Sequence, residues 1–204
     1  IVFLNKIRSI EFRSAGDLIL GFSVKRPSAE KCEWGRVSPE TVLEVYDNAS
    51  AKRISGTMYS APITFGRGEC VSRYGEETAL KSRSLELQAF FPDPEWVFKG
   101  KNGIRLTKGV LYSFLPTQVE TSVPVICHAP FKLDASRENV DSQKENAWFT
   151  RTIGCLGTFV RFCYRVHAQR IRESIVPFLP KFTGHFFERK YNDKLEPLLV
   201  RPLE

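Results

Sequence analysis

The spacing of apolar residues changes about two thirds of the way along the chain, and this change constrains the fold more than any other feature. In the first two thirds, short runs alternate apolar and polar residues, as half-buried strands do. Over residues 147–172 the apolar positions instead recur every three or four residues, which predicts one long amphipathic helix that begins near Glu145-Asn146 and stops before Pro177. Strands followed by a helix predict an α+β fold, with a β-rich domain over 1–145 and a helical extension over 146–204 packed on it.

Seven runs in the β-rich part have strand character. Two of them form a predicted hairpin around a Ser-Ala-Gly-Asp turn, and the last two are expected to be neighbouring buried strands joined through Pro116-Thr117-Gln118. The runs are 7–13, 18–25, 41–46, 53–65, 85–91, 110–115 and 123–127. The segment 66–75 is rich in glycine and charge, which predicts a loop.

The composition describes a folded chain with a modest positive charge. Hydrophobic residues make up 42% of the 204 residues, so a core is possible. Thirty Lys and Arg against 23 Asp and Glu give a net charge of +7, which permits an acidic partner such as nucleotide phosphate or nucleic acid but selects neither. Because several arginines lie on the predicted helix, a basic nucleic-acid-binding module is the alternative function.

The cysteines and the apolar runs indicate the compartment. The five cysteines are odd in number and widely spaced, without a CxxC pair, as expected for free thiols in a reducing cytosol. No apolar run is long enough to cross a bilayer, and no signal peptide is recognisable. We therefore predict a cytoplasmic protein with no membrane partner. Because the chain opens at Ile1 in what reads as the middle of an element, we expect it to be a piece of a longer protein.

Common catalytic motifs are missing. The sequence has no GxxxxGK[ST], no GxGxxG and no GxSxG element. His128, His167 and His185 have no partner at metal-ligand spacing, so we predict no metal site and interpret His128 and His167 as structural. The chain is not expected to be an enzyme on its own.

One polar loop has the chemistry of a ligand contact. Asp134, Ser136, Arg137, Glu138 and Asn139 follow the second of two apolar runs, and loops beyond strand ends often carry binding residues. The planar, permanently charged fork of an arginine suits phosphate. On the pattern alone, a capping turn and a surface ion pair remain open as alternatives.

The residues around this loop resemble those of a known ATPase group. The pieces Phe-Leu-Pro-Thr (114–117), Val-Pro-Val (123–125), His-Ala-Pro-Phe (128–131) and Leu-Asp-Ala-Ser-Arg-Glu-Asn (133–139) are similar to the segment after the ATP-binding domain in sacsin-type and NO VEIN-type proteins. The Ser-Arg-Glu piece also resembles the catalytic loop in the middle domain of the ninety-kilodalton heat-shock chaperone, and residues 2–10 resemble the entry into that domain. The chaperone pattern has a glutamine where this chain has Asp141, so the sacsin-like branch is favoured.

The resemblance implies both a fold and a role. It implies a ribosomal-protein-like βαβ middle domain of a GHKL ATPase, with a mixed sheet and a C-terminal helical segment. It implies that Arg137 contacts the γ-phosphate of ATP held by a preceding GHKL domain, while Asp134, Ser136, Glu138 and Asn139 support the loop. ATP and Mg would belong to the full-length protein, since this chain lacks the acidic base and glycine-rich elements of a GHKL nucleotide site.

A protein client is the remaining partner hypothesis. The aromatic tail could form a docking surface, although packing on its own domain is the favoured interpretation; its apolar members are Phe178, Leu179, Phe182, Phe186 and Phe187.

Overall fold

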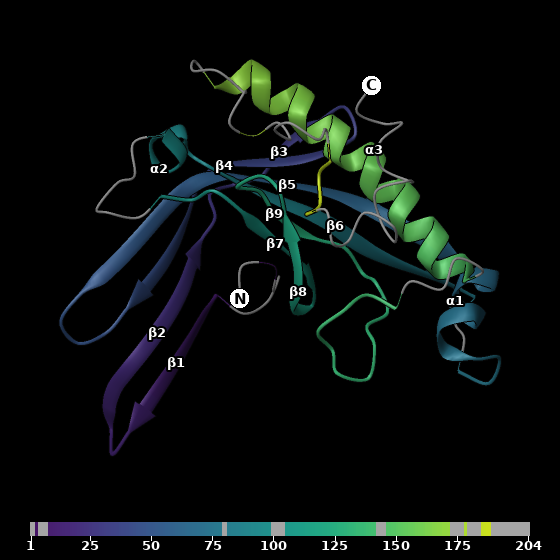
Figure 1. Cartoon of the computed structure of the whole chain (residues 1–204), viewed down its shortest axis with the longest axis horizontal. Helices are drawn as coiled ribbons and strands as arrows, with labels where there is room; N and C mark the ends of the chain where they lie inside the picture. The colour runs from purple at the N-terminus through teal and green to yellow at the C-terminus, as the bar shows by residue number, and fades with distance from the viewer. Residues whose placement is uncertain are drawn as a thin grey trace.

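A computed structural model describes residues 3, 8–78, 81–98, 105–141, 146–171, 178 and 185–188 of the chain. These residues form one mixed, mostly antiparallel sheet with helices, so the predicted α+β class is confirmed (Figure 1). The strands are β1 (Ser9–Ser14), β2 (Asp17–Lys25), β3 (Glu30–Cys32), β4 (Gly35–Tyr46), β5 (Ala51–Gly66), β6 (Ser82–Pro92), β7 (Gly109–Ser113), β8 (Leu115–Thr121) and β9 (Ile126–His128). The helices are α1 (Arg67–Tyr74), α2 (Pro94–Phe98) and α3 (Ala147–Arg170).

The sheet has the order β1-β2-β4-β5-β6-β9-β7-β8, with β3 paired to β4. All pairs are antiparallel except β7 with β9, which run parallel with Leu111 opposite Cys127. The last two apolar runs are therefore neighbouring strands, as predicted. The β1–β2 hairpin also forms as predicted, and Figure 1 shows it extending away from the rest of the sheet.

Helix α3 lies across one face of the sheet and completes the main core (Figure 1). It begins where predicted, because the Asn146 side chain accepts hydrogen bonds from the backbone N–H groups of Trp148 and Phe149. Trp148 stacks on Phe65 of β5 with 3.6 Å between ring centroids. The apolar stripe predicted from spacing faces the sheet, and this core includes residues from both sides of the predicted boundary between 145 and 146.

The predicted loop over 66–75 is wrong, since the structure has helix α1 at this place. The Glu69 carboxylate accepts a hydrogen bond from the Gly66 backbone N–H (2.8 Å) and so caps the first turn. Cys70 is buried, and Ser72 hydrogen-bonds the side chain of Asn146 (3.1 Å). Tertiary contact with α3 stabilises a helix too short to show a clear period in its sequence.

The predicted strand over 110–115 and the linker after it also need correction. The chain turns at Phe114, whose φ is 65°, and returns as β8, which contains Pro116. A positive φ at a residue other than glycine leaves no turn signal in the sequence. Pro116 is tolerated because β8 lies at the edge of the sheet.

The opposite face of the sheet carries a smaller core. Phe3 packs there against Tyr112, with 5.2 Å between ring centroids, and Met58 and Phe90 are buried beside it. Close to this cluster, apolar side chains of the β1–β2 hairpin remain partly exposed, including Phe12 at 54%. The two faces of the sheet are thus covered unequally.

Candidate functional site

The loop over 134–139 is closed at its base and tied to an edge strand. Leu133 and Val140 form a β-bridge, and the Asp134 backbone N–H donates to the Asn139 carbonyl (3.0 Å). The Gln118 backbone N–H of β8 donates to the Glu138 carbonyl (2.7 Å). Figure 1 shows the loop projecting from the sheet away from α3. A backbone held at three points positions the loop without burying it.

Asp134 organises the interior of the loop. Its carboxylate accepts hydrogen bonds from the Ser136 hydroxyl (2.7 Å) and from the Asn139 side-chain amide (3.2 Å). The hydrogen bond from Ser136, followed by those from Asn139, lowers the pKa of Asp134. The structure therefore brings three of the predicted support residues together around one anionic carboxylate, whereas Glu138 contributes its backbone.

Arg137 occupies the tip of the loop and is exposed. Its φ is 61°, a left-handed conformation that costs a residue with a side chain roughly 1–2 kcal/mol. Its backbone N–H donates to the Asp134 carbonyl (3.0 Å). Within the described part of the chain, the Arg137 guanidinium makes no hydrogen bond or ion pair, so the surface ion pair left open by the sequence is not formed there. None of its five N–H donors is therefore engaged by a described residue.

Asp141, the residue at the glutamine position of the chaperone pattern, has a local partner. Its carboxylate lies 3.2 Å from the Lys132 ammonium, at the base of the loop. The negative charge of Asp141 is therefore balanced locally.

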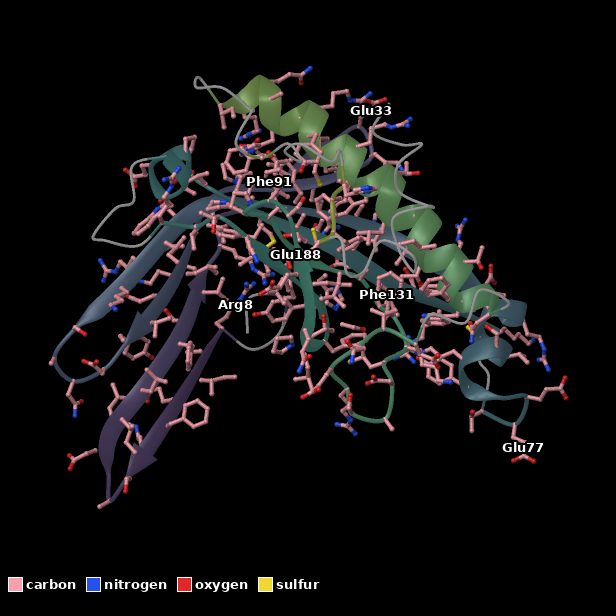
Figure 2. The ribbon with its side chains drawn as sticks, in the orientation of Figure 1. Arg8, Glu33, Glu77, Phe91, Phe131 and Glu188 are labelled. Atoms are coloured by element: carbon pink, nitrogen blue, oxygen red, sulfur yellow. The ribbon has the colours of Figure 1, made fainter. Side chains whose placement is uncertain are left out.

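The arginines on α3 have a different environment. Arg165 pairs with Glu33 (2.6 Å) and Arg170 pairs with Glu30 (3.2 Å), so both reach the β3–β4 hairpin. Figure 2 shows Glu33 beside α3. Arg172 lies outside the described residues. Part of the charge that motivated the nucleic-acid hypothesis is thus neutralised by the protein itself.

The two histidines interpreted as structural are buried. His128 Nδ1 lies 3.2 Å from the Glu86 carbonyl, and His167 Nδ1 lies 2.8 Å from the Tyr59 hydroxyl. Burial lowers the pKa of each to about 4, which keeps both rings neutral at pH 7. Among the described residues, no group of three or more His, Cys, Asp or Glu side chains could hold a metal ion.

The described members of the aromatic tail pack on the domain itself. Phe178, Phe186 and Phe187 are fully buried, and Phe187 forms a β-bridge with Thr121 of β8. Leu179 and Phe182 lie outside the described residues. These three side chains therefore pack on their own domain, as the favoured interpretation predicted.

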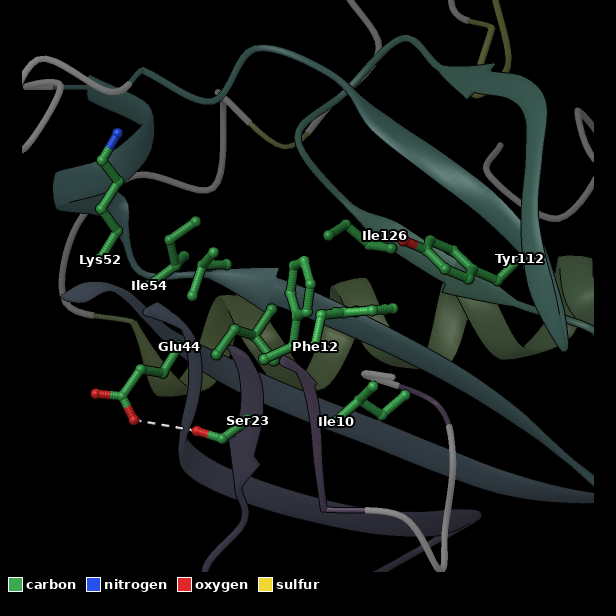
Figure 3. Close-up of a pocket in the computed structure, with 11 residues that line it drawn as sticks. Ile10, Phe12, Ser23, Glu44, Lys52, Ile54, Tyr112 and Ile126 are labelled. Atoms are coloured by element: carbon green, nitrogen blue, oxygen red, sulfur yellow. Dashed lines mark hydrogen bonds between the residues drawn. The ribbon is translucent and has the colours of Figure 1, made fainter. Parts of the chain in front are cut away.

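A second candidate site was not predicted from the sequence. An apolar pocket of about 530 Å³ lies on the sheet face opposite α3 (Figure 3). Its sequence signal was the alternation in the predicted hairpin, which contains Ile10, Phe12 and Phe22, but the remaining walls come from strands distant in sequence.

Comparisons of this chain with protein-family models, curated proteins and solved structures find no match. In the part of the chain that the structure describes, no helix combines the length and apolar character required to span a membrane. The five cysteines are all free.

Proposed function

We propose that this chain is the coupling domain of a GHKL-type ATPase, with the middle-domain fold of that group. In this proposal Arg137 contacts the γ-phosphate of ATP that a preceding GHKL domain binds together with Mg²⁺. Hydrolysis then belongs to the two domains jointly and not to this chain alone. A cytoplasmic location fits the five free cysteines.

The observation that carries the proposal is the state of the Arg137 side chain. It is exposed, it has no partner among the described residues, and its backbone is held in a strained conformation. Strained residues often occur at functional sites, where the surrounding structure maintains them. The Asp134 carboxylate supplies that support through Ser136 and Asn139.

The chemistry of this arrangement suits phosphoryl transfer. A guanidinium that is positioned in advance can stabilise the charge that develops on the transferred phosphoryl group. The loop is hydrogen-bonded to β8 through Gln118 and Glu138. A shift of the loop on contact with nucleotide would therefore also move the edge of the sheet. This is the physical basis for coupling nucleotide state to the rest of the protein.

The test uses the protein that contains both domains. Arg137→Ala should lower ATP turnover by about 10²–10³-fold, because one charged donor to the transition state is lost. ATP affinity and thermal stability should change little, since the side chain is exposed and unpaired in the described structure.

The matched control is Arg165→Ala, which removes an arginine of α3 that is paired with Glu33 of the β3–β4 hairpin. It should leave turnover within about twofold of the wild type. Wild-type turnover in Arg137→Ala would contradict the proposal.

A further inference from the structure

The apolar pocket on the open face of the sheet has the features of a ligand site. Its walls come from six strands, β1, β2, β4, β5, β7 and β9, with Phe12, Phe22, Leu43, Ile54 and Ile126 among the lining side chains (Figure 3). A volume of about 530 Å³ falls in the range of small-molecule sites, which are mainly apolar with a few polar groups. The walls are strand residues, so the site is formed before any ligand arrives.

The one acidic group in the lining is already neutralised. Glu44 accepts a hydrogen bond from Arg53 (2.6 Å) and another from the Ser23 hydroxyl (3.0 Å). The hydrogen bond from Arg53 is the largest cause of the lowered pKa of Glu44. Because its charge is balanced by Arg53, Glu44 neither repels an anion strongly nor requires a cation in the pocket.

Two other polar groups in the lining make no hydrogen bond to the described residues. The Lys52 ammonium forms no ion pair or hydrogen bond in the described part of the chain. Its charge contributes to the lowered pKa of nearby Asp47, but the Asp47 carboxylate accepts hydrogen bonds from the backbone N–H groups of Ala49 and Ser50. The Tyr112 hydroxyl likewise has no hydrogen-bond partner among the described residues, and burial raises its pKa so that it remains a donor. Lys52 is exposed and the Tyr112 side chain is only partly buried, so both groups are accessible to a ligand in the pocket.

The two groups stand apart, with the apolar walls between them. Lys52 stands beside Ile54 at one side of the pocket, and Tyr112 stands beyond Ile126 at the other (Figure 3). A ligand that satisfies both needs an anionic group at one end, an aliphatic middle and a hydrogen-bond acceptor at the other end.

We propose that this pocket binds an elongated aliphatic carboxylate that carries an oxygen at its far end, with the carboxylate on Lys52 and the far oxygen accepting from Tyr112. The charge complementarity at Lys52 selects a carboxylate over a neutral chain. The site is independent of the Arg137 assignment.

The test measures the affinity of the protein for three probes at pH 7 by calorimetry. 10-Hydroxydecanoate has both end groups, decanoate lacks the far oxygen, and 1,10-decanediol lacks the charge. We expect 10-hydroxydecanoate to bind most tightly, with a loss of about tenfold for the diol and about threefold for decanoate.

Single variants test which residue binds each end of the ligand. Lys52→Met should weaken both carboxylates about tenfold and leave the diol unchanged, whereas Tyr112→Phe should reduce 10-hydroxydecanoate to the affinity of decanoate. Lys31→Met on β3, outside this lining, is the control and should change nothing. Absence of saturable binding by all three probes, or binding that Lys52→Met does not alter, would overturn the proposal.

Discussion

Helix α3 and the loop over 134–139 both present arginines, but they hold them in opposite ways. On α3, Arg165 and Arg170 are paired with glutamates of the β3–β4 hairpin, and the helix beneath them is anchored in the main core. In the loop, Arg137 has a strained backbone and a side chain without a partner among the described residues. The difference indicates that Arg165 and Arg170 help to hold α3 against the β3–β4 hairpin, whereas no described residue engages the Arg137 side chain.

The largest stability effect is expected on the α3 side. Trp148 is fully buried, stacks on Phe65 and donates from Nε1 to the Pro130 carbonyl (2.6 Å). Trp148→Ala should therefore lower the free energy of unfolding by about 3–5 kcal/mol in a urea titration. Trp34→Ala, at a ring that is 36% exposed, should cost clearly less. Equal losses in the two variants would mean that the α3 contact is not the main anchor.

A pH dependence of stability should come from the buried histidines. In the unfolded chain a histidine binds its proton near pH 6.5, whereas the pKa of His167 and of His128 in the fold is about 4. The unfolded state therefore binds more protons between these values, and stability falls as the pH decreases from 6.5 towards 4. From pH 7 to pH 5 the loss should be about 2 kcal/mol for each histidine.

His167→Gln keeps a hydrogen-bonding group near Tyr59 and removes the titration. Urea unfolding of this variant should show a shallower loss between pH 7 and pH 5 than the wild type. An identical slope would show that His167 does not contribute to the acid sensitivity.

The smallest effect is expected from the α3 arginines. Arg165→Ala and Arg170→Ala each remove a surface ion pair, so the free energy of unfolding should fall by less than about 1 kcal/mol. The double variant also tests the nucleic-acid hypothesis, since phosphate contacts would produce duplex-DNA binding that weakens steeply with salt. DNA binding in the wild type that disappears in the double variant would show that the α3 arginines bind a ligand, contrary to the comparison above.

Much of the fold could be predicted from local pattern. The apolar stripe of α3 and its cap at Asn146 follow from spacing and side-chain chemistry. The β1–β2 hairpin follows from alternation around the turn at Ala15 and Gly16. In these elements the local signal and the tertiary packing agree.

The rest depends on contacts that are distant in sequence. Helix α1 is stabilised by its contact with α3, and the turn into β8 relies on a left-handed Phe114 that carries no glycine signal. The loop over 134–139 was predicted as polar and beyond a strand, but the sequence does not reveal the Asp134 carboxylate at its centre or the lack of a described partner for Arg137. The apolar pocket assembles from strands spread over residues 10–126, which no single stretch reveals.

The most direct test of the central claim is the affinity for a transition-state mimic. In the protein with both domains, binding of ADP with aluminium fluoride should be compared with binding of ATP, because a contact that acts in the transition state is felt mainly by the mimic. Arg137→Ala should weaken the mimic about 10²-fold or more while ATP affinity stays nearly unchanged, and Arg165→Ala should alter neither. Equal affinity of Arg137→Ala and the wild type for the mimic would contradict the account.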